Sequence, residues 1–129
     1  SVSYNHKKIL IVDDNKLNIK VAKRVLANLD LDIDEAESGD VCLAKVNDNN
    51  YDLILMDIMM PDMSGETTLA KLKENPYFNT PVIALTANSY TGSKDNYIKE
   101  GFTDYLAKPI RYKDLYRLLA KYLTTQEGK

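Results

Sequence analysis

The sequence lacks a second cysteine, because Cys42 is the only one among 129 residues. The chain therefore cannot form an internal disulfide. It also lacks any apolar run long enough to cross a bilayer or to serve as a signal peptide. Both absences favour a cytoplasmic location, and we expect no contact of this domain with a membrane.

Neither sign of charge dominates the sequence. It has 17 lysine and arginine residues against 19 aspartate and glutamate residues, which gives a formal net charge of −2 at pH 7. The lysines are spread along the chain instead of being clustered, so the electrostatic pattern typical of nucleic-acid binding is missing. We therefore expect no direct binding of nucleic acid by this chain.

Length and composition fit one globular domain. With 44% hydrophobic and 28% charged residues, the chain can bury a core but has no room for a second folded domain. No internal repeat or low-complexity segment interrupts it. Because the sequence starts at Ser1 without an initiator methionine, we expect residues 1–6 to be a tail or added residues. Residues 7–124 are then the domain, and residues 125–129 are a C-terminal tail.

The most informative stretch is the apolar run of residues 53–56, which ends in Asp57. A short aliphatic run followed by Pro61 and Gly65 is typical of a strand that is buried on both faces of a parallel sheet. Asp57 then stands at the carboxyl end of a central strand, where open α/β sheets bind ligands. Taken alone, an aspartate in this place more simply starts a turn.

Strand-like and helix-like segments alternate along the whole chain. The other expected strands are residues 8–12, 31–36, 81–85 and 105–107, and the expected helices are residues 16–29, 38–46, 66–74, 93–100 and 112–123. Five strands that alternate with five helices predict an α/β fold, a (βα)5 parallel sheet with right-handed crossovers and helices on both faces. Residues 31–36 alternate between apolar and acidic, which predicts a strand near an edge.

The carboxyl ends of four of these strands bring polar side chains to one edge of the sheet. The residues concerned are Asp13, Asp14, Asp57, Thr86 and Lys108. Three carboxylates held close together repel one another and favour protonation unless a cation lies among them. Their hard oxygens suit Mg²⁺, which often keeps water ligands that a substrate phosphate can replace. With a lysine and a threonine opposite, the set has the parts needed to hold a phosphoryl group.

Several short motifs recur at the same strand ends, and together they are highly specific. They are Asp13-Asp14, Met56-Asp57 followed by Met60-Pro61 and Gly65, Thr86-Ala87, and Lys108-Pro109. On these residues the chain resembles a receiver domain of the bacterial two-component response regulator family, and the resemblance covers positions 8–123. The resemblance implies the flavodoxin-like (CheY-like) doubly wound sheet with strand order 2-1-3-4-5.

The resemblance also implies a phosphoryl-transfer chemistry centred on Asp57. This residue is the implied phosphoacceptor, and the donor is a phosphohistidine on a sensor histidine kinase or a histidine phosphotransfer domain. Asp14 and Asp57 are implied to bind Mg²⁺ directly, Asp13 mostly through water, and the backbone carbonyl of Met59 is implied to complete the protein ligands. Lys108 is implied to pair with the phosphoryl oxygens. Such chemistry depends on alignment and charge neutralisation.

A switch is the second implication of the resemblance. Thr86 is implied to swing toward the phosphoryl group, so that Tyr105 turns inward and changes the face formed by the fourth helix, fifth strand and fifth helix. That face is a candidate for partner binding or for a receiver dimer, and the tyrosines that follow Thr86 favour a docking role. The bond between Lys108 and Pro109 resembles the cis linkage of the family.

Two other functions use a similar layout. A haloacid-dehalogenase-type phosphatase also has an aspartate nucleophile and Mg²⁺, but it carries a second acid two positions later, where this chain has Met59. A flavodoxin-like electron carrier needs a hydroxyl-rich and amide-rich loop after the first strand, whereas Asp13 and Asp14 repel a flavin phosphate. The isolated domain is therefore expected to be a phospho-switch that phosphorylates and dephosphorylates itself, and not a conventional enzyme.

The parent protein is suggested by smaller features. Asn15 with Asn18, and the run of residues 85–88, are similar to receivers attached to hybrid sensor histidine kinases. A stand-alone response regulator is the alternative.

In the receiver family, the residues two positions after the acceptor and two after the switch hydroxyl control how long the phosphoryl group persists. Here these are Met59 and Asn88, which predict slow to intermediate self-dephosphorylation.

Overall fold

Within residues 2–87 and 91–123, which the computed structural model describes, five parallel strands form one sheet in the order β2-β1-β3-β4-β5. The strands are β1 (Lys7–Val12), β2 (Leu31–Ala36), β3 (Leu53–Asp57), β4 (Val82–Thr86) and β5 (Asp104–Ala107). The helices are α1 (Lys16–Leu26), α2 (Gly39–Asp48), α3 (Gly65–Leu72), α4 (Thr91–Lys99) and α5 (Tyr112–Leu123). The predicted fold class and strand order are confirmed.

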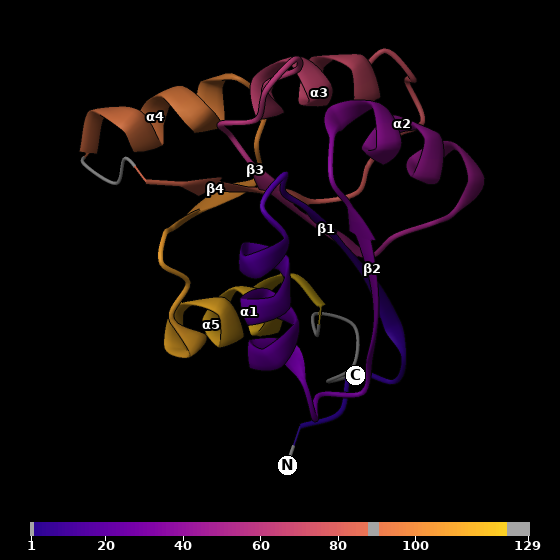
Figure 1. The fold of residues 1–129 in the computed structure, drawn as a ribbon, viewed down its shortest axis with the longest axis vertical. Coiled ribbons are helices and arrows are strands. Elements are labelled where there is room, and N and C mark those ends of the chain that lie inside the picture. Colours follow the sequence, from indigo (N-terminus) through magenta and orange to yellow (C-terminus); the bar gives the residue numbers. More distant parts are fainter. Residues whose placement is uncertain (1, 88–90, 124–129) are drawn as a thin grey trace.

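Helices cover both faces of this sheet. Figure 1 shows α2, α3 and α4 on one side of the strands, and α1 and α5 on the other. The central strands β3 and β4 are buried at every residue, as their unbroken apolar sequences predict. The strand β2 lies at an edge and is mostly half-buried, which agrees with its alternating sequence. Among the described residues, no helix has both the length and the apolar character that crossing a bilayer requires.

Side-chain alternation along the strands divides the core into two clusters. Ile11 and Leu55 belong to the cluster beneath α1 and α5, whereas Val12 and Met56 belong to the cluster beneath α2, α3 and α4. The segment before β1, which the sequence places outside the domain, contributes Tyr4 to the first cluster. This tyrosine is 6% exposed, and its backbone N–H donates to the Leu29 carbonyl oxygen at 2.9 Å.

Polar side chains cap α1, α2 and α3 at their N-terminal ends. The Asn15 side chain accepts hydrogen bonds from the backbone N–H groups of Leu17 and Asn18 and so starts α1. Ser38 and Ser64 cap α2 and α3 in the same way. Because the first N–H groups of a helix have no partner within the helix, such caps fix where each helix begins.

Small shifts separate the expected elements from the observed ones. The strand β4 ends at Thr86, one residue later than expected, and α4 begins at Thr91, two residues earlier. The helix α3 ends at Leu72 instead of residue 74, where the chain turns before Pro76. Thr86 is therefore the last residue of its strand, as Asp57 is of β3.

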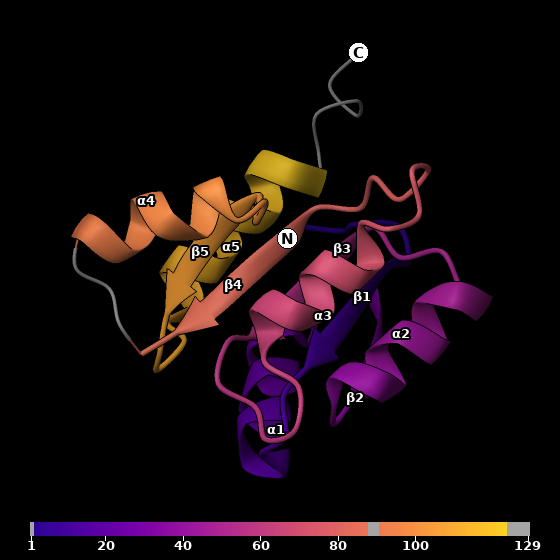
Figure 2. The same cartoon turned by 90° about the horizontal axis from the view of Figure 1, so that it is seen from above.

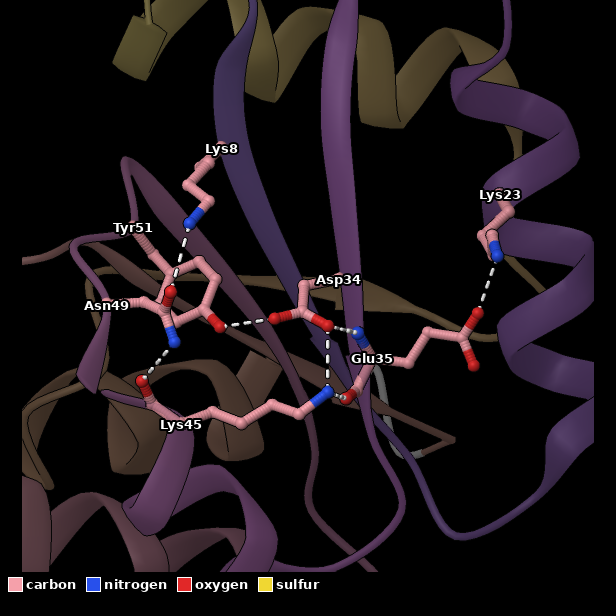
Figure 3. A network of polar contacts seen from close by, with 7 residues as sticks. All are labelled: Lys8, Lys23, Asp34, Glu35, Lys45, Asn49 and Tyr51. Atoms are coloured by element: carbon pink, nitrogen blue, oxygen red, sulfur yellow. Dashed lines mark hydrogen bonds and ion pairs between the residues drawn. The ribbon is translucent and has the colours of Figure 1, made fainter. Parts of the chain in front are cut away.

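The edge strand β2 carries a polar network away from the carboxyl edge of the sheet (Figure 3). The Asp34 carboxylate accepts hydrogen bonds from Lys45 Nζ at 2.8 Å and from the Tyr51 hydroxyl at 2.5 Å. Burial raises the pKa of Asp34, but the bonds from Lys45, Tyr51 and the backbone N–H of Glu35 outweigh it and lower the pKa to about 2. The network ties β2 to α2 and to the start of β3.

Removal of the Tyr51 hydroxyl tests the network. The folded-state pKa of Asp34, about 2, lies below the ordinary value of 3.8, so the charged network stabilises the fold above about pH 4 and is lost as the pH falls through about 2. We expect Tyr51→Phe to lower the free energy of unfolding by about 1 kcal/mol at pH 7, an amount limited by partial exposure to solvent. The difference should shrink toward pH 2.

Urea unfolding at a series of pH values measures this effect. Tyr77→Phe is the matched control, because Tyr77 is 88% exposed and its hydroxyl should not affect stability. An equal loss of stability for Tyr51→Phe at pH 7 and pH 2 would show that the charge of Asp34 does not contribute.

Candidate functional site

Three carboxylates gather at the carboxyl edge of the sheet. Asp13 and Asp14 follow β1, and Asp57 ends β3. Since the strands are parallel, their arrowheads in Figure 2 point to the same edge. One carboxylate oxygen of each aspartate lies within 4.8 Å of the others. Asp13 and Asp57 are 1% and 2% exposed, whereas Asp14 is open to solvent. Two of the acids are thus buried beside a third that faces outward.

Asp13 is held in place from the start of α1. Its carboxylate accepts hydrogen bonds from the backbone N–H of Asn15 at 2.9 Å and from the side-chain amide of Asn18 at 3.2 Å. Burial raises the pKa of Asp13, and the neighbouring charge of Asp57 adds to this, while these hydrogen bonds and Lys108 act in the opposite direction. The two asparagines therefore orient a carboxylate that desolvation disfavours.

Lys108 supplies the opposing positive charge. Its Nζ lies 2.9 Å from Oδ1 of Asp57 and 3.8 Å from Oδ2 of Asp13. The lysine follows β5, where its backbone N–H donates to the Thr86 carbonyl oxygen at 2.9 Å, and its peptide bond with Pro109 is cis. The loop after β5, which is hydrogen-bonded to the end of β4, therefore supplies the positive charge that balances the buried acids.

The loop between β3 and α3 folds back over the backbone of Asp57. A Cβ atom on Gly65 would lie 2.4 Å from the backbone oxygen of Asp57, closer than any side chain allows. The Gly65 N–H donates to the Ile58 carbonyl oxygen at 2.9 Å, and the Met59 N–H approaches Oδ1 of Asp57 at 3.3 Å. Glycine is therefore required for this close approach. The Met59 side chain is 80% exposed.

Thr86 ends the neighbouring strand and is 3% exposed. Its hydroxyl lies 2.8 Å from the hydroxyl of Tyr97 on α4, a contact that the sequence did not predict. Tyr105 on β5 is half-buried and packs against the cluster beneath α2, α3 and α4. Asn88, expected to influence the phosphoryl lifetime, lies outside the described residues.

The expected docking tyrosines do not all share one face. Tyr97 is 8% exposed, whereas Tyr112 and Tyr116 are 58% and 39% exposed. Tyr116 donates to the Val25 carbonyl oxygen on α1 at 3.2 Å, so it lies toward α1 instead of α4. Tyr90 lies outside the described residues.

A hollow of about 350 Å³ borders the site between α1 and the loop after β5. Val21 and Ile110 give it apolar walls, and Asp13 and Lys108 lie at its polar end. The buried charges therefore adjoin an apolar surface.

The donor set suits a hard divalent cation. Three carboxylate oxygens converge from two loops, and carboxylates with water are the ligands that Mg²⁺ prefers. Asp14 is exposed enough to keep water in such a site, and Asp13 is already engaged by two amide donors. Asp13, Asp14 and Asp57 are thus the residues that could hold such an ion.

Comparisons with known proteins agree with this geometry. A family model described as the response regulator receiver domain matches residues 9–120. The signal transduction histidine-protein kinase BarA of Escherichia coli K12 is 37% identical over 115 residues, which cover 88% of this chain and 12% of BarA. Hybrid signal transduction histidine kinase G of Dictyostelium discoideum is 37% identical over 119 residues, which cover 89% of this chain and 4% of that kinase.

Solved structures show the same fold. The receiver domain of sensor histidine kinase PA1611 from Pseudomonas aeruginosa PAO1, with a magnesium ion coordinated in its active-site cleft, is 30% identical with a TM-score of 0.83, covering 93% of this chain and 99% of that one. The Francisella response regulator 1452 receiver domain is 33% identical with a TM-score of 0.79, covering 96% and 100%. This chain belongs to the response regulator receiver domain family of two-component signalling and is related to the receivers of hybrid histidine kinases.

Proposed function

We propose that the domain accepts a phosphoryl group on Asp57 from a phosphohistidine, in the presence of Mg²⁺, and that this changes the face formed by α4, β5 and α5. The donor is a sensor histidine kinase or a histidine phosphotransfer domain. The proposal rests on the environment of Asp57. This residue belongs to a cluster of three carboxylates, and its Oδ1 lies 2.9 Å from Lys108 Nζ.

The transfer exchanges one bond for another at phosphorus. An oxygen of the Asp57 carboxylate attacks the phosphorus, and an O–P bond forms as the P–N bond to the imidazole breaks. The electron pair of the broken bond stays on the imidazole nitrogen, so the donor is left as histidine and Asp57 carries an acyl phosphate. The protein contributes alignment and neutralisation of charge, which are the main requirements of phosphoryl transfer.

Lys108 and the acids divide this task. The ammonium group of Lys108 already lies beside Asp57, where it would pair with an oxygen of the incoming phosphoryl group. Asp14, Asp57 and the backbone carbonyl of Met59 would hold Mg²⁺ directly, and Asp13 would act through water. When bound, the ion supplies positive charge to the oxygens of the phosphoryl group and reduces the repulsion among the carboxylates.

The proposed switch uses Thr86, the last residue of β4, and Tyr105 of the neighbouring strand β5. Thr86 would donate a hydrogen bond to a phosphoryl oxygen, and the half-buried Tyr105 would turn inward as Thr86 moves. A hollow of about 360 Å³ lies along β5 and α5 and includes Tyr105 and Leu118. It marks the surface that such a movement would reshape for a partner or for a second receiver.

The parent protein is proposed to be a hybrid sensor histidine kinase. The chain spans only 12% of BarA and 4% of the Dictyostelium kinase, so their activities as whole proteins belong to this proposal alone. The domain then acts as a phospho-switch in the cytoplasm, with self-phosphorylation by small phosphodonors and self-dephosphorylation.

Replacement of the acceptor is the direct test. We expect the unsubstituted protein to gain one phosphoryl group from acetyl phosphate in the presence of Mg²⁺. EDTA should abolish this gain because it removes the cation, and Asp57→Asn should abolish it because it removes the attacking carboxylate oxygen. Intact mass spectrometry measures the adduct. Asp62→Asn is the control, since Asp62 lies exposed in the loop after the acceptor strand. A phosphoryl adduct on Asp57→Asn would refute the assignment of Asp57.

The lifetime of the acyl phosphate depends on the residue two positions after Asp57. The Met59 side chain is exposed at this point and has no strong hydrogen-bonding group, so it covers the phosphoryl group without orienting water. We expect Met59→Asn and Met59→Glu to lose phosphate roughly tenfold to a hundredfold faster, because a polar group there can position the attacking water. Phosphate release at fixed Mg²⁺ measures this rate. Equal rates in the variants and the unsubstituted protein would show that residue 59 does not control the lifetime.

A further inference from the structure

A buried hydrogen bond joins the end of β4 to α4. Thr86 Oγ1 and the Tyr97 hydroxyl oxygen lie 2.8 Å apart, and both side chains are buried. Tyr97 also makes an edge-to-face contact with Phe102, with ring centroids 6.1 Å apart. The backbone N–H of Phe102 donates to the Tyr97 carbonyl oxygen at 3.1 Å. The Tyr97 hydroxyl is therefore presented to Thr86 by a ring that is packed and fixed.

Side-chain alternation places the Thr86 hydroxyl on the α4 side of the sheet. Ala84, two residues earlier, belongs to the same buried cluster as Tyr97, and residues two apart in a strand share a face. Asp57 lies on the other face, because Leu55, two residues earlier on β3, belongs to the cluster beneath α1 and α5. While the Thr86 hydroxyl is hydrogen-bonded to Tyr97, it therefore lies on the opposite face of the sheet from the acceptor carboxylate.

We propose that Tyr97 is a positioning residue, which holds the Thr86 hydroxyl away from Asp57 and thereby sets how readily the domain enters its phosphorylated state. This inference rests on the proposed function, in which Thr86 donates to the phosphoryl group. A threonine hydroxyl carries one proton, and its χ1 angle has discrete staggered positions. The bond to Tyr97 stabilises the unphosphorylated arrangement, and phosphorylation breaks it.

The same bond links the chemistry to α4. When Thr86 turns to the phosphoryl group, the buried Tyr97 hydroxyl loses this partner, and a buried polar group without a hydrogen bond is unfavourable. The ring then has to shift, and α4 with it, until the hydroxyl finds another donor or acceptor. Tyr97 thus gives α4 a direct response to the position of Thr86, in addition to the proposed movement of Tyr105.

Tyr97→Phe tests the proposal, because it keeps the ring and its contact with Phe102 but removes the hydroxyl. We expect phosphorylation by acetyl phosphate in Mg²⁺ to become roughly threefold to tenfold faster, which is the change in equilibrium expected for one ordinary hydrogen bond. The affinity for beryllofluoride, measured by ¹⁹F NMR titration, should rise by a similar factor.

Two further variants separate positioning from a general structural effect. The double variant Thr86→Val/Tyr97→Phe should be phosphorylated at the same rate as Thr86→Val alone, because the Thr86 hydroxyl that Tyr97 would hold is absent from both. Tyr51→Phe is the matched control, since Tyr51 is also a buried tyrosine with a bonded hydroxyl, and it should not alter phosphorylation. Circular dichroism and thermal unfolding check folding, and Tyr97→Leu provides a second variant without the hydroxyl.

The outcomes distinguish this inference from the function on which it rests. If Tyr97→Phe and Tyr97→Leu are phosphorylated at the parental rate or more slowly while Asp57→Asn stays unmodified, the positioning role of Tyr97 is overturned and the proposed function stands. An equal acceleration by Tyr97→Phe in the Thr86→Val background overturns it as well, because the effect would not act through Thr86. A phosphoryl adduct on Asp57→Asn overturns the proposed function itself.

Discussion

The repulsion among the carboxylates of Asp13, Asp14 and Asp57 is the constraint on which the rest of the site depends. Their oxygens converge within 4.8 Å, and two of the three side chains are buried, so the cluster needs compensating positive charge. Lys108 supplies one charge at 2.9 Å from Asp57. Because the lysine comes from the loop after β5, the acids after β1 and β3 are compensated only when the whole sheet has formed.

Burial and backbone contacts hold Asp57 in place and leave its neighbourhood open to solvent. Asp57 ends a strand that is buried throughout, and the following loop approaches its backbone so closely that Gly65 has no room for a side chain. Asn15 caps α1 and also donates its backbone N–H to Asp13. Asp14 and Met59 nevertheless remain exposed, so the surroundings of the buried Asp57 are open to solvent on one side.

The contact between Thr86 and Tyr97 joins the site to a helix. The family motifs concern residues at the strand ends, whereas Tyr97 lies in the last turn of α4. Its hydroxyl meets Thr86 at 2.8 Å, and its ring packs edge-to-face with Phe102. Among the described residues, Tyr97 therefore connects α4 to the end of β4 through its hydroxyl and to Phe102 through its ring.

The fold class could be predicted from the sequence alone, and so could the meeting of Asp13, Asp14, Asp57 and Lys108 at one edge of the sheet. Unbroken apolar runs before Asp57 and Thr86 predicted buried parallel strands, and parallel strands bring their carboxyl ends to one edge. The burial of Tyr4 in the core and the contact of Tyr97 with Thr86 could not be predicted in this way, because each joins different elements of the fold. Local periodicity indicates which face of a helix or strand is apolar. The contacts between side chains of different elements also depend on how the helices pack on the sheet, and no local sequence pattern specifies this packing.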